Sequence, residues 1–181
     1  LAMEMAARTG IAANLKFPFL MAFVQRELLG LGGGDPEEAP MSKALMAWRI
    51  RAALPALLAA DGDFASVVEY LQEDPDGLKA HQLADHLGEL FDAYVIQRPE
   101  WILAWDAGRQ PPELAGVAEA IWQGKLWRAI SADWRGRHFP ARLQALETSL
   151  AGMSERFRGQ TIRLFGFSSM PVQALALLVR L

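Results

Sequence analysis

The hydrophobic pattern of this chain changes period near both ends, and that change limits the folds open to it. From Met41 to about residue 151, apolar residues recur at helical spacing between turns rich in Gly and Pro. Short β-type segments occur only outside this part, at residues 11–17 and 161–167. Two strands alone do not make a stable sheet, and a parallel pair needs a crossover, here the whole helical part. We therefore expect a mainly helical chain with a minor α/β part: a helical insertion on part of an α/β domain whose other strands lie outside these residues.

The segment after Met41 predicts a helix with one apolar face. The residues that mark this face are Ala44, Leu45, Trp48, Ala52, Leu57 and Leu58. In an amphipathic helix such a face packs inward. Pro55 has no amide hydrogen to donate, so we expect a break or kink there.

Capping and turn residues delimit the other helices. Asp63 can cap a helix that runs through Leu71, and residues 74–77, Asp-Pro-Asp-Gly, predict a turn. A long helix is expected from about residue 78 to residue 97. The remaining expected helices are residues 1–8, 18–29, 99–107, 112–134, 140–151 and 172–181.

The net charge of −3 is an average of two unequal parts. Residues 1–122 carry 9 basic and 18 acidic side chains, whereas residues 123–181 carry 9 basic and 3 acidic ones. This asymmetry indicates a basic face toward phosphate or another acidic partner. The alternative is that the two parts neutralise each other within the fold.

Several classes of function lack their sequence signals. With no cysteine, the chain has no disulfide, thiolate nucleophile or Cys-ligated metal. No apolar run of 18 residues predicts a membrane span, and no basic segment with a cleavage site predicts secretion, so a cytoplasmic protein is expected. The Gly-rich segment 30–34 lacks the Gly-Lys-Ser/Thr of a P-loop. His81 and His86 are five residues apart, too far around a helix to chelate one metal. Around Ser168 and Ser169 the sequence is Gly-Phe-Ser-Ser-Met, which does not match the Gly-x-Ser-x-Gly of a nucleophile elbow.

Aromatic and basic residues give the first positive signal. Six tryptophans are many for 181 residues, and those at near-helical spacing beside Leu and Ile predict packing positions. In the break between two helices, Arg135 and Arg137 follow Trp134. Arginine binds phosphate and tryptophan can stack on an unpaired base, so this segment is a candidate nucleic-acid contact. The alternative is a solvated loop.

A second candidate combines charge with aromatics at residues 91–101. Asp92 and Arg98 lie near the end of the long helix, on an otherwise apolar stripe. Read alone, they are open to a structural interpretation, an ion pair across the helix end.

This motif and four others resemble the RecC family, the gamma subunit of bacterial exodeoxyribonuclease V (RecBCD). The blocks occur in the family's order and together cover nearly the whole chain. They are residues 10–18 (GIAANLKFP), 46–55 (MAWRI with Leu-Pro), 91–105 (FDAYVIQRPEW with Trp105), 122–127 (WQGKLW) and 165–171 (FGFSSMP).

The resemblance implies a fragment from the amino-terminal, helicase-like part of a much larger chain. Residues 1–40 would be a partial α/β segment of domain 1A, which has a P-loop-helicase-like parallel sheet without a functional P-loop. Residues 41–158 would be the helical 1B-like insertion, and residues 159–181 would return to the 1A-like strand and helix. The family's subunit holds DNA, helps to split the duplex and passes one strand through a channel where the recombination hotspot Chi is recognised.

Individual residues match the family's channel-lining positions. Leu90, Asp92 and Arg98 match directly, and Glu89 stands where the family also allows Asp. Phe19 follows the matching Phe-Pro. The resemblance implies that Asp92 accepts from a base amine, that Arg98 contacts phosphate or a guanine edge, and that Leu90 wedges against a base.

We therefore expect a non-catalytic, DNA-contacting fragment that acts in double-strand break repair by homologous recombination. Its expected partners are single-stranded and duplex DNA and the beta and alpha subunits of the enzyme, with no membrane contact. No metal or cofactor is expected in the fragment, because ATP and Mg would be used by the partner subunits in ATP hydrolysis and DNA cleavage. The alternative is a structural helical module that binds other proteins and makes no nucleic-acid contact of its own.

Overall fold

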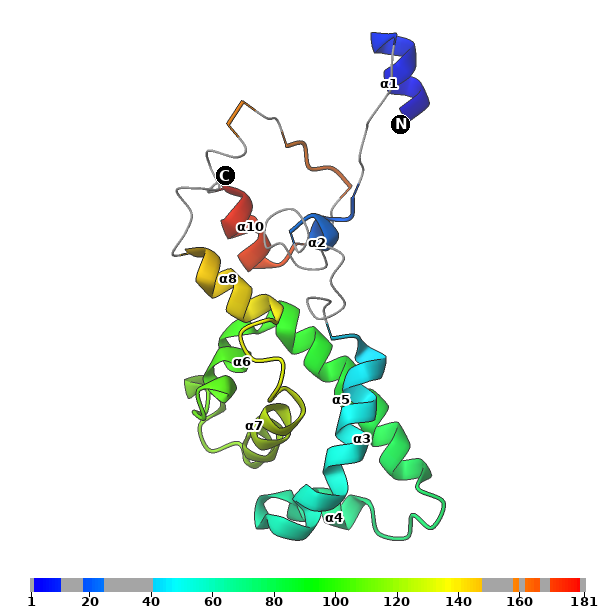
Figure 1. Cartoon of the computed structure of the whole chain (residues 1–181), viewed down its shortest axis with the longest axis vertical. Helices are drawn as coiled ribbons and strands as arrows, with labels where there is room; N and C mark the ends of the chain where they lie inside the picture. Colours follow the sequence, from blue (N-terminus) through cyan, green and yellow to red (C-terminus); the bar gives the residue numbers. More distant parts are fainter. Residues whose placement is uncertain are drawn as a thin grey trace.

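Helices account for all regular secondary structure in the described part of the chain (Figure 1). The computed structural model describes residues 2–10, 18–24, 41–147, 158–159, 162–166 and 170–179. The α-helices are α1 (Ala2–Thr9), α2 (Leu20–Phe23), α3 (Lys43–Ala60), α4 (Ala65–Tyr70), α5 (Leu78–Gln97), α6 (Pro99–Asp106), α7 (Ala118–Ile130), α8 (Phe139–Glu147) and α10 (Val172–Val179). Two short 3-10 helices, Gly62–Phe64 and Pro112–Leu114, precede α4 and α7.

The mainly helical expectation is confirmed, whereas the expected strand at residues 161–167 is not seen. Its described part, residues 162–166, has no regular structure and is exposed to solvent. A strand needs a neighbour to receive its backbone hydrogen bonds, and no described segment offers one. The other β-type segment, residues 11–17, lies outside the described residues.

Helices α3 and α5 pair along their length and form the centre of the helical body (Figure 1). Gly88 of α5 lies so close to α3 that a Cβ atom there would stand 2.9 Å from the carbonyl oxygen of Lys43 and 3.2 Å from the amide nitrogen of Ala47. At the other end, Gly77 lies against Arg51. Later residues of α5 thus face earlier residues of α3, which makes the pair antiparallel.

The apolar face expected for α3 is wrong over its first turns, where Leu45 and Trp48 are exposed and Met46, Ala47, Ile50 and Leu54 are the buried residues. Leu57 and Leu58, also expected on that face, do pack against the core. Of the break or kink expected at Pro55, the break is wrong, because α3 continues through Pro55 to Ala60. Both faces of α3 are apolar, so spacing alone does not decide which of them meets α5.

Local signals placed the boundaries of α5 and α6 correctly. Asp74 accepts hydrogen bonds from the amides of Lys79 and Ala80, at 3.0 and 2.9 Å, and so caps α5. Pro99 starts α6, as predicted. The cap expected from Asp63 is not seen: Asp61 caps the 3-10 helix Gly62–Phe64 by accepting from the amide of Asp63, α4 has no side-chain cap, and the carboxylate of Asp63 pairs with Lys125 at 2.5 Å.

Aromatic rings from three helices fill the core. Phe91 of α5 makes edge contacts with Trp105 of α6 and Trp127 of α7, with ring centroids 6.3 and 5.6 Å apart. All three side chains are fully buried. Gly124 of α7 lies against the Trp105 indole, where a Cβ atom would come within 2.7 Å of the ring. The prediction that most tryptophans serve packing is confirmed, with Trp48 as the exception.

A buried hydrogen-bond network holds α6, α7 and α8 together. The carboxylate of Asp106 accepts from Trp127 Nε1 at 2.9 Å and lies 2.6 Å from His138 Nε2. His138 Nδ1 in turn accepts from the amide of Ala141 in the first turn of α8, at 3.3 Å. Because Nδ1 acts as an acceptor, Nε2 carries the hydrogen that Asp106 receives. His138 is fully buried, so this network places a satisfied polar group inside the core.

We predict that Gly88→Ala loosens the α3–α5 pair. The new Cβ would contact backbone atoms, which cannot move without shifting a helix. Overpacking of this kind costs about 1–3 kcal/mol. The better helix propensity of alanine offsets up to about 1 kcal/mol of that cost. Urea denaturation monitored by circular dichroism should show a lower free energy of unfolding. Gly62→Ala is the control, because a Cβ atom there meets nothing within 4 Å. An unchanged midpoint for Gly88→Ala would contradict the close contact.

We also predict that Asp106→Ala destabilises the chain by about 3 kcal/mol, because it leaves two buried donors, on Trp127 and His138, without an acceptor. The same denaturation measurement applies. Asp85→Ala is the matched control, since Asp85 is an exposed carboxylate whose contact is an exposed 3.5 Å pair with His81. Equal effects of the two substitutions would show that the buried network does not stabilise the fold.

Candidate nucleic-acid interface

Three of the predicted DNA-contacting residues lie on the last three turns of α5. Glu89 and Asp92 are three residues apart and therefore neighbours on one side of the helix. Glu89 is exposed and Asp92 is half-buried. Leu90 projects in another direction and packs partly against the hydrophobic core. A base that wedged against Leu90 would thus meet only the part of its side chain that remains accessible.

The surroundings of Asp92 disfavour the charged form of its carboxylate. Its side chain is 38% exposed, and its nearest counter-charge is the ammonium of Lys43 on α3, 3.8 Å away and itself 59% exposed. Burial raises the pKa of Asp92 above the ordinary value, and Lys43 offsets that rise only in part. An exposed pair at this distance adds little stability. Asp92 therefore retains acceptor capacity that the fold does not use.

Arg98 forms the junction between α5 and α6. Its amide donates to the carbonyl of Tyr94 at 2.9 Å, and its guanidinium donates to the carbonyl of Gln97 at 3.2 Å. The guanidinium carbon lies 5.6 Å from the centroid of the Trp101 ring, a cation–π distance. The interpretation of Asp92 and Arg98 as an ion pair is wrong, because Asp92 pairs with Lys43 instead. Arg98 is exposed, and its planar group is oriented by stacking while most of its donors face solvent.

Phe19 is the most exposed aromatic side chain among the described residues. It precedes α2 in an extended conformation, with φ −60° and ψ 146°, and is 89% exposed. Leu20, the first residue of α2, and Val24, which follows its last residue, are instead buried in the hydrophobic core. An aromatic ring held on an anchored helix and open to solvent is a surface on which a base can stack.

The segment around Arg135 and Arg137 differs from its prediction in one respect. Trp134 is 6% exposed and packs against the rings of Trp127 and His138, so it has no free face for a base. Arg135 is exposed. Arg137 is half-buried and donates to the backbone carbonyl of Asp133. Of the predicted stacking and phosphate contacts, only the phosphate contacts fit this geometry.

The loop that carries these arginines is fixed to α3. Arg49 donates to both carboxylate oxygens of Asp133, at 2.9 Å for the Nη2–Oδ2 pair, and also to the carbonyl of Ile130 at 2.9 Å. Arg49 lowers the pKa of Asp133, so the carboxylate stays charged and the two-point contact persists to lower pH. Sequence reasoning missed this pair, because 84 residues separate its members and neither lies in a recognisable motif.

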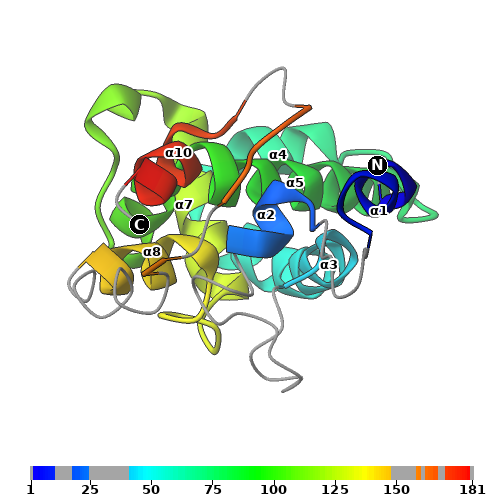
Figure 2. The same cartoon turned by 90° about the horizontal axis from the view of Figure 1, so that it is seen from above.

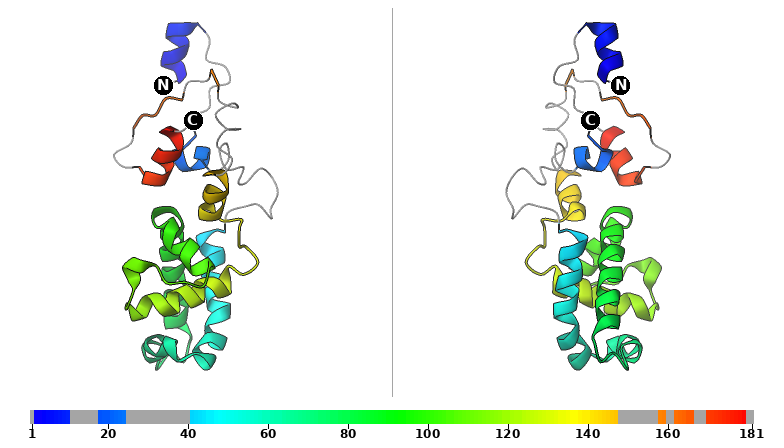
Figure 3. Two further views of the ribbon diagram at one scale, coloured as in Figure 1. Left: turned by 90° about the vertical axis from the view of Figure 1, so that its left-hand side faces the viewer. Right: turned by 90° about the vertical axis from the view of Figure 1, so that its right-hand side faces the viewer.

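The structure thus presents the predicted residues as three separate groups. Glu89, Leu90, Asp92 and Arg98 share the end of α5, Phe19 belongs to α2, and the two arginines belong to the loop between α7 and α8. Helices α2 and α10 lie together beyond the α8 end of the helical body, which Figures 1 and 3 show from three sides. Seen from above, α2 lies over the side of the body that contains α3 and α5 (Figure 2). Lys43 at the start of α3 is an addition to the α5 group that sequence reasoning missed.

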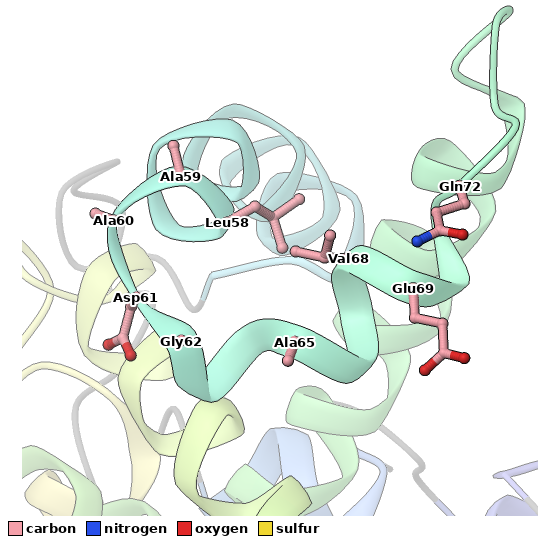
Figure 4. Close-up of a pocket in the computed structure, with 9 residues that line it drawn as sticks. All are labelled: Leu58, Ala59, Ala60, Asp61, Gly62, Ala65, Val68, Glu69 and Gln72. Atoms are coloured by element: carbon pink, nitrogen blue, oxygen red, sulfur yellow. The ribbon is translucent and has the colours of Figure 1, made fainter.

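The described residues also contain a pocket of about 570 Å³, at the far end of α3 (Figure 4). Its lining comes from the end of α3, the following turn and α4, and consists of Leu58, Ala59, Ala60, Asp61, Gly62, Ala65, Val68, Glu69 and Gln72. Leu58 and Val68 point toward each other across it, while the carboxylates of Asp61 and Glu69 point away (Figure 4). None of the predicted site residues lines this pocket.

Within the described ranges, no three His, Asp or Glu side chains are grouped so that they could hold a metal ion. Over the same ranges, no helix is long and apolar enough to cross a bilayer.

Comparison with known proteins identifies the family. The model of the RecC N-terminal domain matches residues 1–181. The chain is 34% identical over 151 residues to the RecBCD enzyme subunit RecC of Haemophilus influenzae, an alignment that covers 74% of this chain and 13% of that protein. It is 35% identical over 131 residues to the subunit of the same name from Escherichia coli K12, covering 72% of this chain and 11% of that protein. The chain therefore spans about an eighth of the length of these relatives, and it belongs to the RecC N-terminal domain family.

Proposed function

We propose that this chain is a non-catalytic, DNA-contacting part of a RecC-type subunit. In a RecBCD-type enzyme of the bacterial cytoplasm it would line the path of single-stranded DNA and take part in Chi recognition, during double-strand break repair by homologous recombination. The observation that carries the proposal is the match of all 181 residues to the RecC N-terminal domain. Both relatives are named as subunits of the RecBCD enzyme.

The chemistry of the exposed groups supports this role. Phe19 offers a stacking face, Arg98 offers free guanidinium donors for a phosphate or a guanine edge, and Asp92 offers an acceptor for an exocyclic amine. Leu90 supplies apolar contact, Glu89 a second acceptor beside Asp92, and the loop with Arg135 and Arg137 a further phosphate contact. Each of these side chains is at least partly accessible.

The catalytic steps are assigned to other polypeptides. We infer that ATP hydrolysis and DNA cleavage, with the ATP and Mg²⁺ they require, belong to the beta and alpha subunits. The contribution of this chain is binding and positioning. A base that stacks on Phe19, or one that hydrogen-bonds to the polar groups of α5, needs no proton transfer or nucleophile, only shape and hydrogen bonds.

We also propose the domain division implied by the RecC resemblance. Residues 41–158 form a 1B-like helical insertion, and residues 1–40 and 159–181 belong to one 1A-like α/β domain. The position of α2 beside α10 supports this division, because the two helices come from the two flanking segments and lie together in Figures 1 and 3. Helix α10 exposes Val172 and Val179, by 74% and 77%, as expected for a helix that a larger domain covers.

We predict that Arg98→Ala and Phe19→Ala weaken DNA binding in different ways. In the complete enzyme complex, Arg98→Ala should reduce the slope of log affinity against log salt by about 0.7, the value for one phosphate contact on a single strand. Phe19→Ala should lower affinity by about 1–3 kcal/mol without changing that slope, because stacking releases no counterions. Fluorescence anisotropy with a labelled oligonucleotide at several salt concentrations measures both quantities.

Arg109→Ala is the control for charge loss, since Arg109 is exposed but lies after α6, away from the α5 group. Arg135→Ala tests the second basic group by the same slope. Affinities that equal that of the control in all three test variants, Arg98→Ala, Phe19→Ala and Arg135→Ala, would remove the DNA-contacting role and leave the alternative, a helical module that binds only protein.

We further predict that Asp92→Asn does not destabilise the chain at neutral pH. Because burial raises the pKa of Asp92 in the folded state, the stabilisation from this group is present at low pH and is lost as pH rises through the folded pKa. Asparagine does not ionise, so the variant does not lose stability as the pH rises. Its urea midpoint at pH 7 should therefore equal or exceed that of the parent, and the two midpoints should converge in acid. Asp85→Asn, an exposed carboxylate on the same helix, is the control.

A lower midpoint for Asp92→Asn at pH 7 would show that Asp92 serves the fold. An unchanged or higher midpoint, together with an altered response of the complex to Chi, would assign Asp92 to DNA recognition.

A further inference from the structure

The outward face of α3 carries an uninterrupted apolar stripe. The exposed residues along it are Ala44, Leu45, Trp48, Ala52, Pro55, Ala56 and Ala59. Leu45 and Trp48 are 45% and 67% exposed. No charged side chain interrupts the stripe from residue 44 to residue 59, because Arg49 and Arg51 lie to its sides and contact Asp133 and the region of Gly77.

The spacing of the stripe is that of a helix-packing seam. Leu45, Trp48, Ala52, Pro55 and Ala59 follow one another at intervals of three, four, three and four residues. This is the a/d pattern by which one helix packs its side chains between those of another. Four alanines in the stripe allow a close approach, and Trp48 supplies one large side chain to fill a hollow on the opposing surface.

Helix α3 is therefore apolar on two opposite faces. One face packs against α5 and α7 through Met46, Ile50 and Leu54. Helix α3 lies at the edge of the helical body in both views of Figure 3. Its other face is exposed from Ala44 to Ala59, with a ring contact between Trp48 and His81 of α5, 6.3 Å between centroids, at its flank. A helix that is apolar all round is typical of the interior of a large protein.

We infer that this stripe, Leu45 to Ala59, is covered in the complete subunit by a helix of the same polypeptide that lies outside residues 1–181. The inference rests on the proposed function only in placing this chain within a larger RecC-type subunit. The lengths of the relatives indicate where the covering helix comes from. This chain aligns with only 13% and 11% of those proteins, so most of a RecC-type subunit lies outside these residues.

Two observations favour the same polypeptide over the other possible occupants. An apolar patch of this length left open until assembly would promote aggregation. The basic side chains beside the stripe are held by the fold, because Arg49 pairs with Asp133 and Arg51 lies against Gly77, so they do not form a surface for the DNA backbone. The expected occupant is an amphipathic helix with small and apolar residues at a/d spacing.

The test measures the accessibility of the stripe in the complete subunit. Ala52→Cys places a thiol on the stripe, and Ser66→Cys places one on exposed α4, outside it. Residues 1–181 contain no natural cysteine, so peptide mass spectrometry after N-ethylmaleimide treatment reads each thiol separately. In the isolated complete subunit, Cys at position 52 should react at least about tenfold more slowly than Cys at position 66, and the two rates should converge in urea.

Each outcome decides the inference. Equal native rates would overturn it, as would protection that appears only when another subunit is added, or protection that disappears on dilution and so reveals a second copy. A benzoylphenylalanine at position 45 provides an independent reading: on irradiation it should cross-link to a peptide of the same polypeptide beyond these 181 residues, and a cross-link to another polypeptide or to DNA would contradict the inference. The DNA affinity of the Ala52→Cys subunit should equal that of the parent, so failure here is distinguishable from failure of the DNA-contacting role.

Discussion

The partly buried carboxylate of Asp106 is the interaction on which the arrangement of the helical body depends. It ends α6, receives hydrogen bonds from Trp127 on α7 and from His138 at the start of α8, and so joins three helices around the Phe91 ring. A charged group in such a core is tolerable only when its lone pairs are occupied. The position of α8, and of the loop that carries Arg135 and Arg137, follows from meeting that requirement.

Elements with strong local signals were predictable from the sequence, and those that depend on tertiary contacts were not. The boundaries of α5 and α6 follow from the Asp74–Gly77 turn and from Pro99, whose effects act within a few residues. The first turns of α3 were assigned the wrong buried face because both faces are apolar there, and the close contact with Gly88 selects one of them. Trp134 was expected to be a ligand for bases because nothing in its neighbourhood of the sequence reveals that Trp127 and His138 cover it.

In the candidate interface, too, some features were predictable from the sequence and others were not. Leu90, Asp92 and Arg98 were found through resemblance to a family, whereas their surroundings were not predictable from spacing. The ion pair expected between Asp92 and Arg98 is replaced by a longer one to Lys43, and Arg98 rests instead on Trp101. Lys43 reaches the site only because α3 runs back along α5, a consequence of packing that no motif records.

Lys43 also connects the geometry of the core to the charge of the surface. Its carbonyl oxygen is the atom that leaves no room for a side chain at position 88, and its ammonium is the counter-charge of Asp92. Because Gly88 has no Cβ, the start of α3 packs directly on α5. This close packing also brings the ammonium of Lys43 near the carboxylate of Asp92. A lineage could retune the electrostatics of this surface by changing one buried glycine while every charged residue stayed the same.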